Sequence, residues 1–126
     1  MKTRSVLAAL AIVTAVGVSA SPAQANDVDV RGTATCNAGV KAKIKAGPRD
    51  PGQIKTNIQI DDRGAVPQVW TIIVTDGAET QSLMTTTAGV SNSIDQDVFT
   101  GNGAGADTVS FTATRAGASC SGTVTV

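Results

Sequence analysis

The sequence has 126 residues with ten basic and ten acidic side chains, no histidine, and only Trp70, Phe99 and Phe111 as aromatic residues. This length suits a single domain. With no excess of positive charge and few rings for stacking on bases, the composition argues against a nucleic-acid or anionic-membrane partner. Without histidine, the usual general base of hydrolytic enzymes is missing.

The N-terminus has the pattern of a secretory signal peptide. Two basic residues precede an uncharged apolar run over residues 6–18, and Ala23-Gln24-Ala25 forms an A-x-A cleavage site. The run is shorter than the roughly 20 apolar residues of a transmembrane helix. We therefore predict a signal peptide over residues 1–25, cleaved near Ala25, and a secreted, extracellular domain over residues 26–126 without a membrane anchor.

Cys36 and Cys120 are the two cysteines of the chain. Export places them in an oxidising compartment, where an even number of cysteines in a small domain predicts a disulfide. The alternative is a pair of free or metal-binding thiols. Two thiolates without histidine make a poor zinc site, so we predict a structural disulfide and no metal or cofactor.

Alternation with a period of two dominates the first half of the secreted domain. Residues 28–36 alternate up to Cys36, and residues 40–46 alternate small or apolar side chains with Lys41, Lys43 and Lys45, the clearest half-buried strand. Residues 47–52 (GPRDPG) are dense in turn formers. Residues 54–60 then place three isoleucines and a threonine on one face of a strand.

The second half continues in the same way. A loop over residues 61–67 precedes residues 69–75 (VWTIIVT), which are apolar on both faces and predict a strand covered on both sides. Asp76-Gly77 is a hairpin signal. Further strands are expected over segments rich in β-branched residues, which are separated by turns or by the glycine-rich residues 101–107. These segments are residues 80–87, 93–99, 109–114 and 120–126.

The pattern predicts an all-β fold, an immunoglobulin-like β-sandwich of seven or eight short antiparallel strands. No segment of the secreted domain has a helical period. Cys36 on the first strand and Cys120 on the last would tie the two ends together. Because immunoglobulin domains join inner strands of opposite sheets instead, the topology can differ in detail, and a Greek-key barrel is the alternative.

Several short motifs occur in a fixed order: a first cysteine, Lys-x-Lys-x-Lys, Pro-Arg-Asp, Arg-Gly before the tryptophan, Asp-Gly, Ala-Gly-x-Asp, and a closing Cys-x-Gly-x-Val-x-Val. In this arrangement the chain resembles small exported actinobacterial all-β proteins of uncharacterised function with two outer cysteines. The resemblance implies a fold and a location, with no established activity. The composition is also similar to that of apoproteins that carry enediyne chromophores, although those have two disulfides and this chain can form one.

The stretch Asn102–Val109 lies one residue from the calcium nonapeptide G-G-x-G-x-D-x-U-x, with Asp107 at the acidic position. A β-roll calcium site needs oxygen ligands from several stacked repeats, and the sequence contains one copy. We therefore interpret it as a glycine-rich loop in which Asp107 bonds backbone N–H groups at the start of the next strand.

Asp61 and Asp62 are a second calcium candidate, because adjacent carboxylates on an exposed turn can coordinate the ion. The favoured interpretation is a turn in which Asp ends a strand and Gly64 allows a positive φ. Asp95 and Asp97 would share one strand face, as solvated charges or as protection of an edge strand. Together with Asp29, these carboxylates could also supply the pair needed for glycoside hydrolysis, but the chain lacks aromatic platforms for sugars.

Lys41, Lys43 and Lys45 predict a row of cations on one face, with Lys55 on the neighbouring strand. The row is either a binding surface for acidic cell-wall polymers or a protein, or a solvated face that discourages edge pairing. Trp70 is expected in the core.

The leading hypothesis is a secreted, non-catalytic β-sandwich module that binds an unknown protein or cell-envelope component. Its binding residues are not identifiable from the sequence. The alternatives are a small-molecule or ion carrier with a cleft between the sheets, and an enzyme without a recognisable catalytic set.

Overall fold

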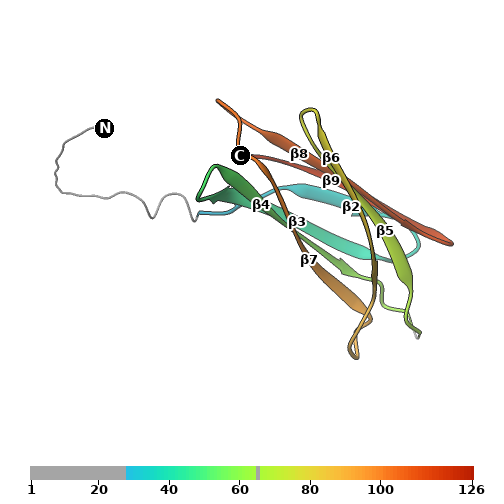
Figure 1. Cartoon of the computed structure of the whole chain (residues 1–126). Coiled ribbons are helices and arrows are strands. Elements are labelled where there is room, and N and C mark those ends of the chain that lie inside the picture. Colours follow the sequence, from blue (N-terminus) through green and yellow to red (C-terminus); the bar gives the residue numbers. More distant parts are fainter. Residues whose placement is uncertain (1–27, 65) are drawn as a thin grey trace, which may run out of the picture.

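The computed structural model describes residues 28–64 and 66–126, which form two antiparallel β-sheets packed face to face (Figure 1). The all-β sandwich expected from the sequence is therefore confirmed. The predicted signal peptide and its cleavage site near Ala25 lie outside the described residues. Within those residues, no helix is long and apolar enough to span a membrane.

The described residues contain nine strands. They are β1 (Val30–Arg31), β2 (Thr33–Cys36), β3 (Lys41–Arg49), β4 (Gln53–Asp61), β5 (Val69–Asp76), β6 (Glu79–Thr86), β7 (Ser93–Gly101), β8 (Thr108–Arg115) and β9 (Ala118–Thr125). One sheet has the order β1-β3-β4-β7 and the other β2-β9-β8-β5-β6. In immunoglobulin domains the second and third strands belong to different sheets, whereas β3 and β4 form a hairpin within one sheet. The immunoglobulin-like part of the prediction is therefore not confirmed.

The strand count exceeds the predicted seven or eight because the first expected strand divides at Gly32. β1 pairs with β3 in the four-stranded sheet, and β2 pairs with β9 in the other. At the crossing point, a Cβ atom on Gly32 would lie 2.1 Å from the carbonyl oxygen of Thr123. A residue without a side chain is therefore required where the chain passes from one sheet to the other.

The turn expected over residues 47–52 is shorter than predicted. β3 continues through Pro48 to Arg49, and the turn begins at Asp50. Alternate residues of a strand direct their backbone N–H and C=O groups to the same side. The carbonyl of Ile44 accepts a hydrogen bond from Gly32 on the β1 side, so the backbone of Pro48, four residues later, faces that side too. The missing N–H of Pro48 thus faces the sheet edge, where a strand tolerates proline.

The two sheets enclose one core, which includes the predicted core residue Trp70 and the inward-facing isoleucines of β4. The expectation that residues 69–75 are covered on both faces is wrong. Val69 is 51% and Ile73 40% exposed on the outer face of β5, and Met84 of β6 beside them is 71% exposed. An apolar run does not distinguish a strand between two layers from a strand whose outer face is uncovered.

The disulfide between Cys36 and Cys120 is present and joins β2 to its neighbour β9. Because these are the first and last strands of the five-stranded sheet in sequence, the bond ties the two ends of the chain together, as predicted. The preceding strand β8 is the other partner of β9.

Candidate functional site

The outer face of the four-stranded sheet carries three rows of polar side chains, one on each long strand. The rows are in register, so that three cross-strand sets run from β3 through β4 to β7. These sets are Lys41–Asp61–Ser93, Lys43–Gln59–Asp95 and Lys45–Asn57–Asp97. Lysines therefore occupy one side of this face. In two of the three sets an amide stands in the centre and a carboxylate on the far strand, whereas the third set has Asp61 in the centre and Ser93 on the far strand.

The central amides hold the carboxylates of β7 in place. Asn57 donates hydrogen bonds from Nδ2 to Asp95 Oδ1 at 2.5 Å and to Asp97 Oδ1 at 2.8 Å, and Gln59 donates to Asn57 Oδ1. Lys55 lies 3.7 Å from Asp97 Oδ2. Asp95 and Asp97 share one strand face as predicted, on a strand at the sheet edge.

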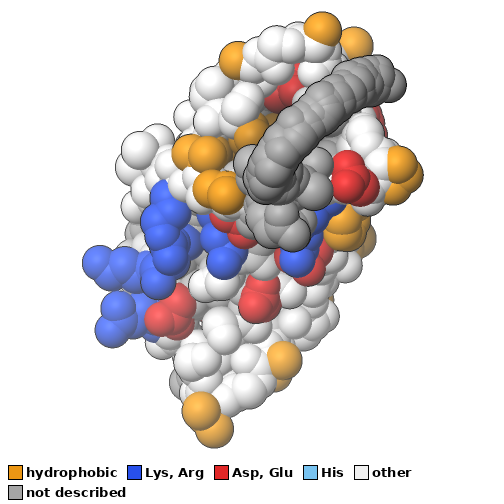
Figure 2. Space-filling model, turned by 90° about the vertical axis from the view of Figure 1, so that its left-hand side faces the viewer, with side chains coloured by type: hydrophobic (Ala, Val, Ile, Leu, Met, Phe, Trp, Pro, Cys, Tyr) orange, Lys and Arg blue, Asp and Glu red, His pale blue; other side chains and the backbone are white. Residues whose placement is uncertain are grey.

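The cations of the described residues fall into two groups. Arg49, Lys55 and Arg115 each form an ion pair with an aspartate. The remaining cations have no ion pair within the described part of the chain. They lie along one side of the outer face of the four-stranded sheet, which is called here the charged face. We call this second group the basic row; it consists of Arg31, Lys41, Lys43, Lys45 and Arg63. Figure 2 shows a group of basic side chains on the left of the view, with further basic and acidic side chains interspersed across the face.

Two members of the basic row lie directly opposite each other. Arg31 on β1 pairs in register with Lys45 on β3, and like charges in such positions destabilise a sheet. The lysines point to the same side of β3, with Lys41 and Lys43 exposed. The row therefore concentrates positive charge that the described residues leave without an ion-pair partner.

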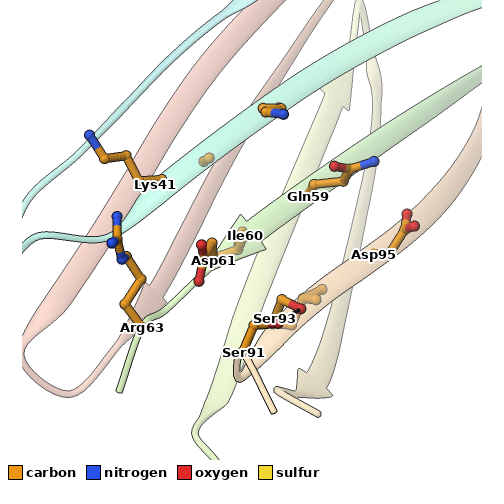
Figure 3. A pocket seen from close by; sticks show the side chains of 11 residues that line it. Lys41, Gln59, Ile60, Asp61, Arg63, Ser91, Ser93 and Asp95 are labelled. Atoms are coloured by element: carbon orange, nitrogen blue, oxygen red, sulfur yellow. Dashed lines mark hydrogen bonds between the residues drawn. The ribbon is translucent and has the colours of Figure 1, made fainter. Parts of the chain in front are cut away.

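Arg63 belongs to the loop after β4, and its neighbours fix its position. Its φ of 63° lies in the left-handed region, which is unfavourable for a residue with a side chain. On one side, the Asp62 N–H donates to the carbonyl of Asn92, and on the other, Asn92 Nδ2 donates to the carbonyl of Gly64. The loop is thereby held where Arg63 projects beside Lys41 (Figure 3).

Asp62 is not the exposed turn residue that the sequence suggested. Its side chain is fully buried, and it accepts hydrogen bonds from Arg115 Nε and Nη2, both at 2.8 Å, and from Trp70 Nε1 at 2.9 Å. The Arg115 guanidinium also lies over the Trp70 ring. These three residues, called here the Asp62 cluster, connect the end of β4 with β5 and β8.

The contacts within the Asp62 cluster shift the pKa values of its two ionisable groups in opposite directions. The hydrogen bonds from Arg115 lower the pKa of Asp62 below its usual value, against an opposing effect of burial, and the bond from Trp70 lowers it further. The hydrogen bonds to Asp62 in turn raise the pKa of Arg115. Both groups are therefore charged under ordinary conditions, and the carboxylate is buried against three hydrogen-bond donors instead of facing solvent. Asp62 thus has a structural position next to the basic row.

An open depression of about 550 Å³ lies at the end of the charged face. Lys41, Lys43 and Arg63 line one side, and Ser93 and Asp95 line the other, with Gln59 and Asp61 between them (Figure 3). Ala42, Ile60 and Ile94, from the three strands of this face, also line it. The depression offers cations next to hydroxyl, amide and carboxylate groups that can bond a polyhydroxylated ligand.

The outer face of the five-stranded sheet has a different character, because its outward positions carry hydroxyl or apolar side chains and no charge. The hydroxyl-bearing residues are Thr33, Thr35, Thr71, Thr75, Thr80, Ser82, Thr86, Thr108, Ser110, Thr112, Thr114, Ser119, Ser121, Thr123 and Thr125. Two shallow depressions along β9 are lined by these groups. The charged face is therefore the more specific candidate for binding.

Asp107 lies in the glycine-rich loop, apart from the other candidate carboxylates. Its backbone pairs with Val126 and so extends the β8–β9 ladder. With the Asn102 amide oriented to donate, Nδ2 lies 2.8 Å from Asp107 Oδ2. The side chain thus contacts an amide side chain, where the sequence suggested backbone N–H groups. No group of three or more potential ligand side chains for a metal occurs within residues 28–64 and 66–126.

The carrier hypothesis requires a cleft between the sheets. The depressions described above open on outer faces, and large buried side chains such as Trp70, Phe111 and Ile72 fill the space between the sheets. The catalytic hypothesis also gains no assembled group, because Asp29 pairs with Arg49 and the β7 carboxylates bond Asn57. Neither hypothesis has been tested.

The sequence identified the three lysines of the basic row but not Arg31 or Arg63. The alternation of residues 28–36 could have placed Arg31 on a strand surface, but not beside Lys45. Arg63 lies in a loop, where periodicity gives no direction. Comparison with protein-family models, curated proteins and solved structures finds no match to this chain.

Proposed function

We propose that this chain is a secreted, non-catalytic β-sandwich module that binds a protein or cell-envelope partner through the basic row. The observation that carries the proposal is the separation of the cations. Arg49, Lys55 and Arg115 are each paired with an aspartate, whereas the five members of the basic row have no ion pair in the described chain and lie side by side.

The physical argument concerns the free energy of the unbound protein. Clustered like charges destabilise the free fold, and Arg31 opposite Lys45 is an unfavourable cross-strand pair. The negative groups of an anionic partner would be attracted to these cations and would offset their mutual repulsion. The partner would also be drawn to the row from a distance. The carboxylates of β7 are about 10 Å from the row, two strand spacings, and Asp61, in register with Lys41, forms no ion pair with it.

The non-catalytic part of the proposal rests on the side chains available. The sequence has no histidine, and both cysteines form the disulfide. The export part rests on the N-terminal sequence pattern and agrees with the presence of a disulfide, which oxidising compartments favour.

The test is capture by envelope preparations from the producing cells. Purified residues 26–126 should be retained by the envelope fraction and released by raised salt. The triple variant K41Q/K43Q/K45Q should not be retained. K55Q is the single-charge control, because it removes one positive charge from the same face, at a lysine paired with Asp97. Equal retention of the wild type and the triple variant, or retention of neither by envelope or secreted proteins, would contradict the proposal.

A further inference from the structure

The spacing of the basic row restricts the kind of anion that can use all of it. Residues i and i+2 of a strand point to the same face, about 6.7 Å apart, so Lys41, Lys43 and Lys45 form a straight line of about 13 Å. Arg31 lies beside Lys45 at one end, and Arg63 projects beside Lys41 at the other. A single small anion can contact only part of this line.

A polymer with one negative charge per six backbone bonds has the matching repeat. Three backbone bonds of an extended peptide span about 3.5 Å, so six single bonds span about 7 Å. A chain of three-carbon polyols joined by phosphodiesters has six backbone bonds per charge. Successive phosphates of such a polymer can therefore face successive lysines of β3 without stretching either chain.

The chemistry of the row also favours phosphate. Lysine binds phosphate as a compact point charge without an orientation requirement, whereas arginine supplies the planar fork suited to bidentate contacts. Here the three central positions are lysines, and arginines stand only at the two ends. This arrangement suits tetrahedral phosphates along the line, with bidentate contacts where the bound segment enters and leaves.

The groups beside the row complement the rest of such a polymer. Gln59, Ser93 and Asp95 line the depression next to Lys41 and Lys43 and can exchange hydrogen bonds with polyol hydroxyls. The backbone of the loop that carries Arg63 is already ordered, because Asp62 and Gly64 each form a hydrogen bond with Asn92. Less conformational freedom is then lost when a ligand binds there.

Resting on the function proposed above, we propose that the basic row is a binding site for a linear poly(polyol phosphate) chain. The polymer lies along β3, with consecutive phosphates against Lys41, Lys43 and Lys45. Arg63 contacts the phosphate beyond Lys41, Arg31 shares the phosphate that faces Lys45, and the polyol hydroxyls face the depression.

The experiment titrates residues 26–126 with synthetic poly(glycerol phosphate) by calorimetry over a range of salt concentrations. Each lysine near an anionic surface contributes about 1 kcal/mol, or roughly five-fold in affinity. K43Q should therefore bind about five-fold more weakly, and K43Q/K45Q about 25-fold. Each substitution should reduce the slope of log Kd against log salt by about 0.7. K55Q should stay within two-fold of the wild type, and equal losses in K55Q and K43Q would overturn the proposed alignment along β3.

Two further probes separate this inference from the broader proposal. Glycerol 3-phosphate, a single repeat, should bind far more weakly than the polymer, and comparable affinity would overturn the linear site. Poly-L-glutamate tests charge alone, and equal affinity for it would overturn the phosphodiester assignment. If poly(glycerol phosphate) does not bind while envelope retention still depends on the three lysines, this inference fails and the proposed function stands. If the polymer does not bind and envelope retention does not depend on the three lysines, both this inference and the proposed function are rejected.

Discussion

The Asp62 cluster and the basic row are neighbouring charged regions with opposite environments. In the cluster, one buried carboxylate accepts hydrogen bonds from Arg115 and Trp70. In the row, exposed or half-buried cations stand side by side without ion pairs in the described chain. Under our proposal, charge on this small domain serves two purposes. Charges satisfied internally support the fold, whereas charges left unsatisfied are available for a partner.

The two regions meet in the loop after β4. Asp62 is held by the cluster, and the next residue, Arg63, is the end of the basic row. The cluster therefore has a second role under our proposal, because it fixes the backbone from which a binding cation projects. Substitutions in the cluster should mainly change stability, and substitutions in the row should mainly change binding. Only at the junction of Asp62 and Arg63 should one substitution change both.

The largest expected effect follows from Asp62→Ala. The substitution leaves the Arg115 guanidinium and the Trp70 N–H without their acceptor. Removing one partner of a buried pair is strongly destabilising, and because part of Arg115 remains in contact with water, we expect a loss of about 3 kcal/mol. Urea unfolding measures the change. Polymer affinity should also fall, because Arg63 loses its fixed position; a loss of stability below 1 kcal/mol would show that the cluster does not support the fold.

Acid titration should reveal the same contribution in the wild-type protein. The pKa of Asp62 in the folded state is lowered from 3.8, mainly by the hydrogen bonds from Arg115. The stabilisation is therefore complete above this ordinary value and is lost as the pH falls through it towards the lowered pKa. Urea midpoints measured from pH 6 to pH 2 should fall more steeply for the wild type than for D62A, and parallel curves would contradict the assignment.

The disulfide belongs to the five-stranded sheet and is not part of either region. Replacing Cys36 and Cys120 by alanine removes a link across a sequence separation of 84 residues. The typical loss is about 2–4 kcal/mol, because the unfolded chain gains freedom. Thermal unfolding should show this loss, while polymer affinity measured well below the melting temperature should be unchanged. A matching loss of affinity would show that the row depends on global stability and not on its local geometry.

Thr56 tests the opposite case, a buried polar group without a partner. Its hydroxyl oxygen is inaccessible to water and has no hydrogen bond, on the inner face of β4 directly behind the charged face. Thr56→Val keeps the branched shape and removes the unpaired hydroxyl, so we expect a gain of about 1 kcal/mol. Differential scanning calorimetry would detect the higher melting temperature, and Thr56→Ser is the control that keeps the hydroxyl and loses a methyl group.

The smallest effect on stability is expected in the basic row itself. Lys45→Gln removes the repulsion with Arg31, so stability should stay the same or rise by up to about 0.5 kcal/mol, even as polymer affinity falls. Low-salt urea unfolding resolves such a difference best, because screening weakens the repulsion. A clear loss of stability would mean that Lys45 supports the fold.

Much of the fold was predictable because alternation is a local property. In β3 and β4 the apolar residues identify the inward face, and the lysines of β3 therefore had to face outward. The same reasoning failed for residues 69–75, because burial of the second face depends on whether another layer covers it. Gly32 also shows the limit, since a change of sheet within a strand leaves no periodic signal.

The sequence by itself determined the strand-rich pattern, the identity of the disulfide partners and the row of three lysines, because these follow from alternation and from having two cysteines. Tertiary structure decided that amides, not carboxylates, stand opposite Lys43 and Lys45. It also decided that Arg31 and Arg63 extend the row, and that Asp62 is buried against Arg115, 53 residues away. These features depend on which strands become neighbours, and that choice minimises the free energy of the whole sandwich instead of any local segment.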